Sequence, residues 1–316
     1  MFFIAKKSSC SVLLFLTALT LLSNSCTSTF KKAARPSIPH YNVQIIKDVN
    51  YLPDGRAEKA DLYLPKRPDE TVSPAVVLIH GGGWFGGDKA KKTREASIAE
   101  FLAQNGYVSI SINYRLSTKT QPSWPQNLYD CKAAVRFLRK NASLYHIDPQ
   151  KIALIGFSAG AHLAALTALT ANDKDLAGND PYLSVPSDVR AVVCFYGAYV
   201  LSNVENRDMT RQMLGVSLQQ DPNLWSLASP ASHITRDAPP FLLLHGSADK
   251  VVSLKHSSQM HSLLLQAGAD STFLPIKDAP HSFDLHSSGR DLSKILLIWL
   301  NAKLNYSNNS IGEHIK

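Results

Sequence analysis

A serine between two glycines stands where a short apolar run gives way to a segment with the composition of a helix. The residues are Gly156-Phe157-Ser158-Ala159-Gly160, with the apolar run 151–155 before them and the alanine- and leucine-rich run 161–169 after them. At a sharp turn from strand to helix a serine side chain is forced outward, which exposes its hydroxyl to a substrate. The flanking glycines lack the Cβ atoms that would obstruct a close approach of strand and helix. Ser158 is therefore a candidate nucleophile for acyl transfer.

A second glycine-rich stretch, His80-Gly81-Gly82-Gly83-Trp84, follows an earlier apolar run at 75–79. Consecutive glycines let the backbone bend so that two N–H groups point at one spot. Donors arranged in this way stabilise the negative charge that develops on a carbonyl oxygen under attack. We expect the N–H groups of Gly82, Gly83 and Ala159 to form such an oxyanion hole. A flexible glycine loop without this role is the alternative.

A serine hydroxyl needs a base to remove its proton and a carboxylate to orient that base. Asp249 lies just past the apolar run 240–245, and His281 lies just past the run 271–276. Because the carboxyl ends of neighbouring parallel strands meet at one edge of a sheet, we expect both side chains to reach Ser158. The order serine, acid, histidine along the chain is the order found in α/β-hydrolases.

Other histidines and aspartates fit these two roles less well. His162 is expected to pack behind the serine, and His245, at a strand end, to support the turn that follows. His256 and His261 lie on a predicted helix and are expected to be solvated or packed against it. Asp278 and Asp284 lie too close to His281 in sequence to orient it from the opposite side. Asp130 begins a predicted helix, where the helix dipole favours an acidic side chain.

The elements that must position these residues alternate along the chain. Apolar runs predict eight strands, near 41–47, 59–64, 74–79, 107–114, 151–155, 190–196, 240–245 and 271–276. Helices are predicted near 94–104, 130–141, 159–170, 256–266 and 290–304. This alternation predicts an α/β fold, with an eight-stranded, mostly parallel sheet flanked by helices. A chain of 316 residues that is 45% hydrophobic is long enough to bury a large single core.

Residues 199–235 interrupt the alternation after a strand at the catalytic edge. Loops at this edge build the substrate pocket in α/β proteins, so we expect a partial lid over the serine. A surface connection with one ordinary helix is the alternative. Trp84, Trp124 and Trp225 are candidates to line a flat sugar- or aryl-binding wall, and each has the hydrophobic core as its other possible location.

The N-terminal 25 residues have the pattern of a secretion signal, because two lysines precede the apolar run 11–22. That run is too short to remain as a spanning helix. Small residues then lead to Cys26, which resembles the acylated cysteine of a bacterial lipoprotein, although Ser23 stands where leucine is usual. We therefore expect a secreted protein, or a periplasmic or outer-membrane-anchored lipoprotein, of a bacterium. The predicted parts are a signal at 1–25, a tether at 26–40, a catalytic domain at 41–305 and a tail at 306–316.

The formal net charge of +8 is mildly basic for this length, with clusters at 31–35 and 89–94. A solvated face near an anionic membrane explains these clusters, and attraction to a polysaccharide bearing uronic acids is the second interpretation. Nothing in the sequence predicts nucleic-acid recognition. Cys131 and Cys194 are expected to be buried free thiols. No spacing of cysteines and histidines predicts a metal site, and acyl transfer by a serine requires no cofactor.

The chain resembles α/β-hydrolases of the esterase and lipase group that carry a His-Gly-Gly-Gly-Trp motif, and among them the small bacterial acetyl- and feruloyl-esterases that act on decorated xylan. The matching stretches are 60–65, 80–84, 113–116, 156–164, 245–249 and 281–283. One departure is Ala161, where many relatives have a second glycine.

The resemblance implies an α/β-hydrolase fold with the triad Ser158, Asp249 and His281. It also implies hydrolysis of short acyl or feruloyl esters on plant polysaccharides. Related sequences differ in substrate, so an amide, peptide or formamide substrate for the same triad remains an alternative. A catalytically inactive carbohydrate-binding protein is the alternative from another functional class.

Overall fold

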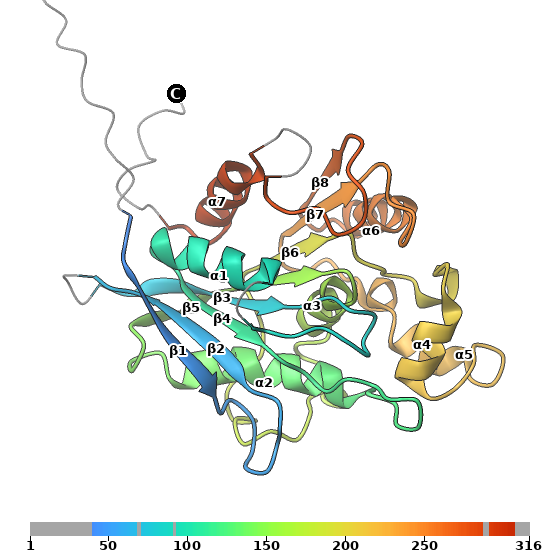
Figure 1. Ribbon diagram of the computed structural model, residues 1–316. Helices are drawn as coiled ribbons and strands as arrows, with labels where there is room; N and C mark the ends of the chain where they lie inside the picture. The colour runs from blue at the N-terminus through green and yellow to red at the C-terminus, as the bar shows by residue number, and fades with distance from the viewer. Residues whose placement is uncertain (1–39, 68–70, 91–92, 287–290, 307–316) are drawn as a thin grey trace, which may run out of the picture. The chain divides into compact units, whose positions relative to one another are not determined.

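The computed structural model describes residues 40–67, 71–90, 93–286 and 291–306. Its eight strands form a sheet with the order β1-β2-β4-β3-β5-β6-β7-β8 (Figure 1). The strands are β1 (Val43–Val49), β2 (Ala60–Pro65), β3 (Ser73–Ile79), β4 (Val108–Ile112), β5 (Ile147–Phe157), β6 (Ala191–Phe195), β7 (Phe241–Gly246) and β8 (Ser271–Ile276). β2 pairs antiparallel with β1 and with β4, and the other neighbouring strands are parallel. The predicted α/β-hydrolase fold with a mostly parallel sheet is confirmed.

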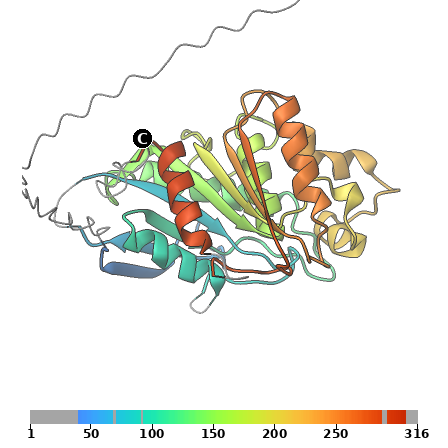
Figure 2. The ribbon, with the colours of Figure 1, turned by 90° about the horizontal axis from the view of Figure 1, so that it is seen from above.

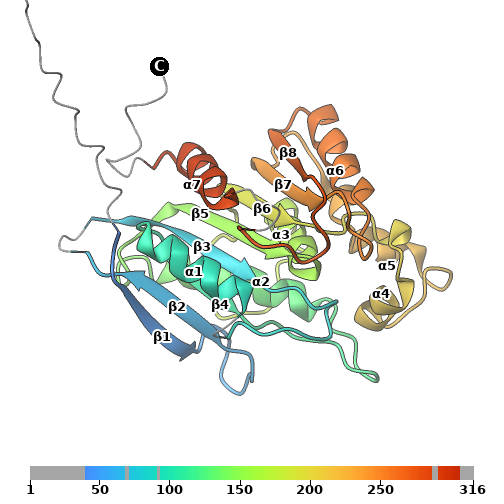
Figure 3. The ribbon, with the colours of Figure 1, turned by 45° about the horizontal axis from the view of Figure 1, so that its top comes forward.

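The central strands are buried on both faces, because helices cover each side of the sheet (Figures 2 and 3). The α-helices are α1 (Arg94–Gln104), α2 (Gln126–Lys140), α3 (Ala159–Leu169), α4 (Arg207–Leu214), α5 (Pro222–Leu227), α6 (Lys255–Gln266) and α7 (Leu292–Lys303). α1 and α7 pack on one face, and α2, α3 and α6 pack on the other.

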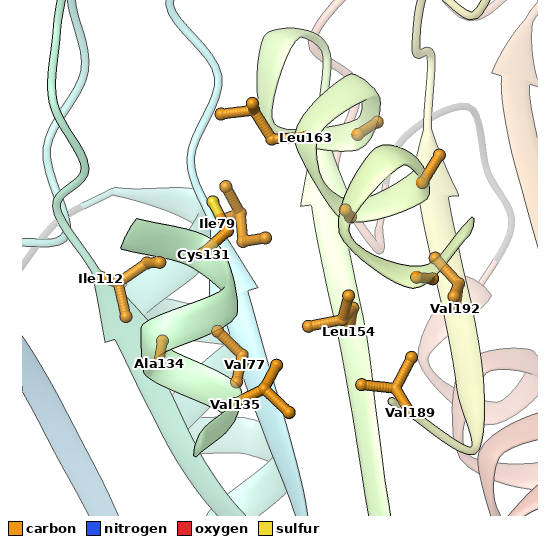
Figure 4. Packing of buried hydrophobic residues seen from close by; sticks show 14 of the residues in the cluster. Val77, Ile79, Ile112, Cys131, Ala134, Val135, Leu154, Leu163, Val189 and Val192 are labelled. Carbon is orange, nitrogen blue, oxygen red and sulfur yellow. The ribbon is translucent and has the colours of Figure 1, made fainter. Parts of the chain in front are cut away.

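The alternation of side chains along β3 shows how one strand serves both layers. Val77 and Ile79 point into the core under α2 and α3, while Val76 and Leu78 point into the core under α1 and α7. Figure 4 shows Ile79 beside Cys131 and Val77 beside Val135, both partners on α2, in the first of these cores. A strand buried on both faces is mostly apolar, which is why β3 appears as a nearly continuous apolar run in the sequence. β4 is also buried but contains two serines, Ser109 and Ser111.

The predicted element boundaries agree with the structure to within a few residues, with one instructive exception. α2 begins at Gln126, directly after Pro125, and has no side-chain cap. Asp130 consequently lies one turn inside the helix, fully buried, and accepts hydrogen bonds from Arg56 Nη2 at 2.7 Å and Arg115 N at 2.8 Å. The interpretation of Asp130 as a first-turn acid is wrong, because the residue lies beyond the first turn. Besides Gln126 of the same helix, it binds groups from other parts of the fold.

The segment 199–235 folds into more structure than a single helix. It contains α4 and α5 together with two short 3-10 helices, η1 (Leu201–Asn203) and η2 (Pro230–His233). Asn206 caps α4, which ends at Gly215 in the left-handed conformation. Asp221 caps α5 with Pro222 in its first turn.

Some predictions concern residues outside the described ranges. They are the signal at 1–25, acylation of Cys26, the tether up to residue 39 and the tail from residue 307, and they stay predictions. Among the helices that the structure describes, none has the length and apolar character needed to cross a bilayer. Cys131 and Cys194 are free and buried, as expected.

Candidate active site

Ser158 occupies the turn between β5 and α3. Its φ of 52° and ψ of −116° place a non-glycine residue in a rarely populated region of backbone conformation. Such strain persists only when the surroundings hold it, and here the Ser158 N–H donates to the carbonyl oxygen of Phe195 at the end of β6, 2.9 Å away. The turn exposes the serine side chain to a cavity.

The two glycines around the serine are required by contacts between main-chain atoms. A Cβ on Gly156 would lie 2.2 Å from the carbonyl oxygen of Gly160. A Cβ on Gly160 would lie 2.1 Å from the carbonyl oxygen of Ile79, the last residue of β3. The predicted close approach of strand and helix is confirmed, and the end of β3 takes part in it as well.

Ser158, His281 and Asp249 form a continuous chain of hydrogen bonds. His281 Nε2 lies 3.0 Å from Ser158 Oγ, and His281 Nδ1 lies 2.6 Å from Asp249 Oδ2. Asp249 follows β7 and His281 follows β8, so the pairing of these two parallel strands brings the side chains together. The structure thus places all three predicted residues in one hydrogen-bonded chain, with His281 in the middle.

The carboxylate of Asp249 is fully buried and held from both sides. Its Oδ1 accepts hydrogen bonds from the N–H groups of Val251 at 2.8 Å and Val252 at 2.9 Å. Burial by itself raises the pKa of Asp249, but the hydrogen bonds from His245, His281 and these two N–H groups outweigh it and hold the pKa well below its usual value. The ionised carboxylate keeps the proton of His281 on Nδ1, so Nε2 is free to accept the proton of Ser158.

His245 supports this arrangement from the end of β7. Its Nε2 lies 3.2 Å from Asp249 Oδ2 and 2.9 Å from the carbonyl oxygen of Val252. Its Nδ1 lies 2.7 Å from Ser257 Oγ. The structural role expected for His245 agrees with these contacts.

The loop that follows β3 lies directly against the nucleophile. A Cβ on Gly81 would lie 3.3 Å from the Cβ of Ser158. Gly82 and Gly83 adopt φ values of 114° and 61°, which only glycine adopts readily. Within the described residues, the N–H groups of Gly82, Gly83 and Ala159 donate no hydrogen bond to a protein acceptor. They are available to an oxygen atom bound beside Ser158.

Trp84, which closes this loop, is anchored to the helix that follows the serine. Its Nε1 donates a hydrogen bond of 3.1 Å to His162 Nδ1, and His162 Nε2 donates one of 2.8 Å to the carbonyl oxygen of Ala228. Burial lowers the pKa of His162 to about 4, so the imidazole is neutral and can serve as acceptor and donor at once. The packing role expected for His162 agrees with this environment.

A cavity of about 1070 Å³ opens beside Ser158. Its walls include the glycine loop at 80–88, residues 204–210 before and within α4, and residues 250–252. Part of the segment 199–235 therefore borders the space where a substrate would bind. Within the described residues, no group of three His, Cys, Asp or Glu side chains is arranged to hold a metal ion.

The three tryptophans that were candidates for a binding wall have different locations. Trp84 lines the cavity, whereas Trp124 and Trp225 do not. Trp225 is only 1% exposed and donates from Nε1 to the carbonyl oxygen of Val216. Trp124 packs on a small core cluster formed by Leu128, Leu166 and Leu176. The expectation is wrong for these two, because large aromatic side chains fill cores as readily as pockets.

Comparison with known proteins identifies a family and several similar esterases. The family model BD-FAE matches residues 60–264. The chain belongs to the BD-FAE family. Esterase LipQ of Mycobacterium tuberculosis is 34% identical over 253 residues, which cover 77% of this chain and 58% of LipQ. The probable carboxylic ester hydrolase LipM of the same organism is 32% identical, with coverage of 77% and 57%. This BD-FAE chain thus spans less than two thirds of the length of these curated relatives.

Two solved structures similar to this BD-FAE protein are esterases. A truncated carbohydrate esterase from gut microbiota superposes with a TM-score of 0.76 at 29% identity, covering 86% of this chain and 100% of the other. Esterase 2 of Thermogutta terrifontis, phosphorylated by paraoxon, superposes with a TM-score of 0.66 at 26% identity, covering 86% and 96%.

Sequence reasoning missed several side chains of the BD-FAE cavity, among them Arg94, Tyr196, Glu205 and Met209. Tyr196 had a usable signal, since it directly follows β6 and lies at the same sheet edge as the serine. Glu205 and Met209 lie in the segment 199–235, for which a partial lid was predicted without naming individual side chains. Arg94 had no such signal, because its place at the cavity depends on the tertiary fold.

Proposed function

We propose that this chain is a serine carboxylesterase. The observation that carries the proposal is the unbroken contact of Asp249, His281 and Ser158, at 2.6 and 3.0 Å, beside glycine N–H groups that have no acceptor among the described residues. This arrangement supplies a nucleophile, a base and an oxyanion site in one place. The family and its esterase relatives support the same reaction class.

The reaction proceeds in two acyl-transfer steps. Ser158 Oγ attacks the ester carbonyl carbon while His281 Nε2 takes the serine proton, and the N–H groups of Gly82, Gly83 and Ala159 bind the oxyanion. When the tetrahedral intermediate collapses, the bond to the alcohol breaks and His281 returns the proton to the departing alcohol. Water then attacks the acyl-serine with His281 as base, which releases the carboxylic acid and regenerates the serine.

The substrates we propose are short acyl esters, acetyl above all, or feruloyl esters on a plant polysaccharide such as xylan. Two similar proteins support this choice by what they are called. A bifunctional GH43-CE protein of Bacteroides eggerthii superposes with a TM-score of 0.73 at 28% identity, covering 82% of this chain and 38% of that one. Endo-1,4-beta-xylanase B of Butyrivibrio fibrisolvens is 28% identical over 192 residues, which cover 60% of this chain and 29% of the xylanase.

The test compares residues 27–316, as wild type and as Ser158→Ala, on polymer and on small esters. Acetate and ferulate release from decorated xylan are measured beside hydrolysis of p-nitrophenyl esters from acetate to octanoate. We expect the wild type alone to release acid from xylan and to prefer the short esters. Hydrolysis of small esters without release from xylan would reject the polysaccharide substrate. Equal activity of Ser158→Ala on every substrate would reject the serine mechanism.

A further inference from the structure

The loop that carries His281 is held in a strained conformation. Asp278 and Ser282 both have positive φ values, of 57° and 65°, although neither is glycine. Conformations of this kind are unfavourable in themselves and persist where other contacts enforce them. The imidazole of His281 must stay within hydrogen-bonding distance of Ser158, so whatever fixes this loop also fixes the base.

Two side chains from distant parts of the sequence bind the main chain just after His281. Arg94, the first residue of α1, donates from Nη2 to the carbonyl oxygen of Ser282 at 2.8 Å. Arg94 Nη1 donates to Tyr196 Oη at 2.5 Å. The Tyr196 hydroxyl in turn donates to the carbonyl oxygen of Phe283 at 3.4 Å. The carbonyl groups of two successive residues are therefore restrained by one connected pair of side chains.

Tyr196 also touches the imidazole itself. Its ring meets that of His281 edge to face, with 4.7 Å between the centroids and 62° between the planes. The tyrosine is fully buried, has a φ of 43°, and donates its N–H to the carbonyl oxygen of Leu244 at 2.7 Å. Burial raises the pKa of Tyr196 although the Arg94 guanidinium opposes this, so the hydroxyl keeps the proton that it donates.

Arg94 contacts residues next to both the base and the nucleophile. Its guanidinium carbon lies 5.8 Å from the ring centroid of Phe157 and 5.7 Å from that of Tyr196. Phe157 is the residue directly before Ser158. A planar guanidinium with donors in a fixed fork suits such simultaneous contacts, and a lysine ammonium cannot reproduce the fork.

We propose that Arg94 and Tyr196 are positioning residues that hold His281 in reach of Ser158 through the carbonyl groups of Ser282 and Phe283. The inference rests on the proposed function, in which His281 is the general base. The inference gives a role to Arg94, a cation at the cavity wall that the proposed reaction does not use. A displacement of the base by about 1 Å is enough to lower turnover by about 10²-fold.

The experiment measures kcat and KM for p-nitrophenyl acetate in Arg94→Gln, Arg94→Lys, Tyr196→Phe and the control Arg236→Gln. Arg236 is an exposed arginine before β7, at the opposite sheet edge, so its substitution removes the same charge. Rates are counted per active site that a fluorophosphonate labels, which removes any effect of misfolded protein. We expect Arg94→Gln to lower kcat about 10²-fold with little change in KM, because positioning acts on the chemical step. Arg94→Lys should recover part of this loss.

A second measurement reports on the base without any substrate. The Nδ1 proton of His281, shared with Asp249, should give a proton resonance at low field in the wild type and in Arg236→Gln. We expect Arg94→Gln and Tyr196→Phe to broaden or shift it. Should Arg94→Gln keep kcat within about threefold, or change KM alone, the positioning role is refuted. An unchanged resonance would refute it independently.

These outcomes separate the inference from the proposed function. If the wild type shows no esterase activity that depends on Ser158, the proposed function fails, and the resonance still decides whether Arg94 holds His281. If Ser158→Ala is inactive and Arg94→Gln has normal kcat and a normal resonance, only the inference fails.

Discussion

Replacing Asp249 by asparagine exchanges one oxygen for an NH₂ group, and the structure dictates which oxygen is lost. Oδ1 accepts two main-chain N–H groups, from Val251 and Val252, so the amide oxygen of the variant must stay at that position. The NH₂ group then takes the place of Oδ2. There it faces His281 Nδ1 at 2.6 Å and His245 Nε2 at 3.2 Å in the wild-type geometry.

The NH₂ group can only donate, so His281 Nδ1 must become an acceptor and the imidazole proton must move to Nε2. Nε2 then donates to Ser158 Oγ instead of removing its proton. The wrong tautomer lowers kcat by about 10⁴-fold in a serine protease triad, which corresponds to about 5–6 kcal/mol in the activation free energy. We expect a loss of this size for Asp249→Asn, and the same direction for the rate of fluorophosphonate labelling.

The assay is kcat on p-nitrophenyl acetate at pH 7, with Asp278→Asn as the matched control. Asp278 lies in the loop that carries His281, but its side chain is exposed and its positive φ is one that asparagine adopts well. The control should therefore keep wild-type turnover. Turnover of Asp249→Asn within about tenfold of the wild type would refute the view that this carboxylate sets the tautomer of His281.

Two further predictions concern stability. The pKa of His162 falls from 6.5 to about 4 on burial. Between these two pH values the unfolded chain binds a proton at His162 that the folded chain does not bind. The free energy of unfolding should therefore fall by about 3 kcal/mol as the pH is lowered through this window. Urea unfolding at pH 7, 5.5 and 4.5 should show a shallower pH dependence for His162→Gln, and parallel curves would contradict the assignment. Gly160→Ala should abolish a cooperative melting transition near the wild-type Tm, because its Cβ would lie 2.1 Å from a carbonyl oxygen. The control is Gly86→Ala, whose Cβ would lie 3.7 Å from the carbonyl oxygen of Gly82. This control should melt within a few degrees of the wild type. Equal melting of the two alanine variants in circular dichroism would count against this close packing at Gly160.

Strand ends and obligatory glycines were predictable because each has a recognisable local sequence pattern. A strand buried on both faces is mostly apolar, and residues after such strands gather at one edge of a parallel sheet. This rule alone brings Ser158, Asp249 and His281 together. Gly156 and Gly160 were predictable because a turn that excludes Cβ atoms admits no other residue.

Contacts between distant segments have no such local sequence pattern. Arg94 and Tyr196 are 102 positions apart and meet only because the tertiary fold brings the first residue of α1 to the residue that follows β6. A tryptophan such as Trp225 is equally compatible with a core and with a pocket, so the sequence could not show that it is buried. Its location depends on how the segment 199–235 folds. The predicted start of α2 is too late because its N-cap, Pro125, offers no side-chain acceptor, whereas Asp130 has the acidic side chain typical of a first turn.

The contacts of Gly156, Gly160 and Ile79 have a bearing on how the substrate range of such a protein can diverge. The serine turn and the start of the glycine loop touch through main-chain atoms, so no side-chain substitution there can tune their separation without disrupting the fold. Another part of the cavity wall, at 204–210, comes from a segment outside the sheet. New acyl or alcohol groups can therefore be accommodated by exchanging residues of that wall while the reacting geometry stays constant. Variation among homologues should accordingly concentrate at 204–210 and be nearly absent at the serine turn.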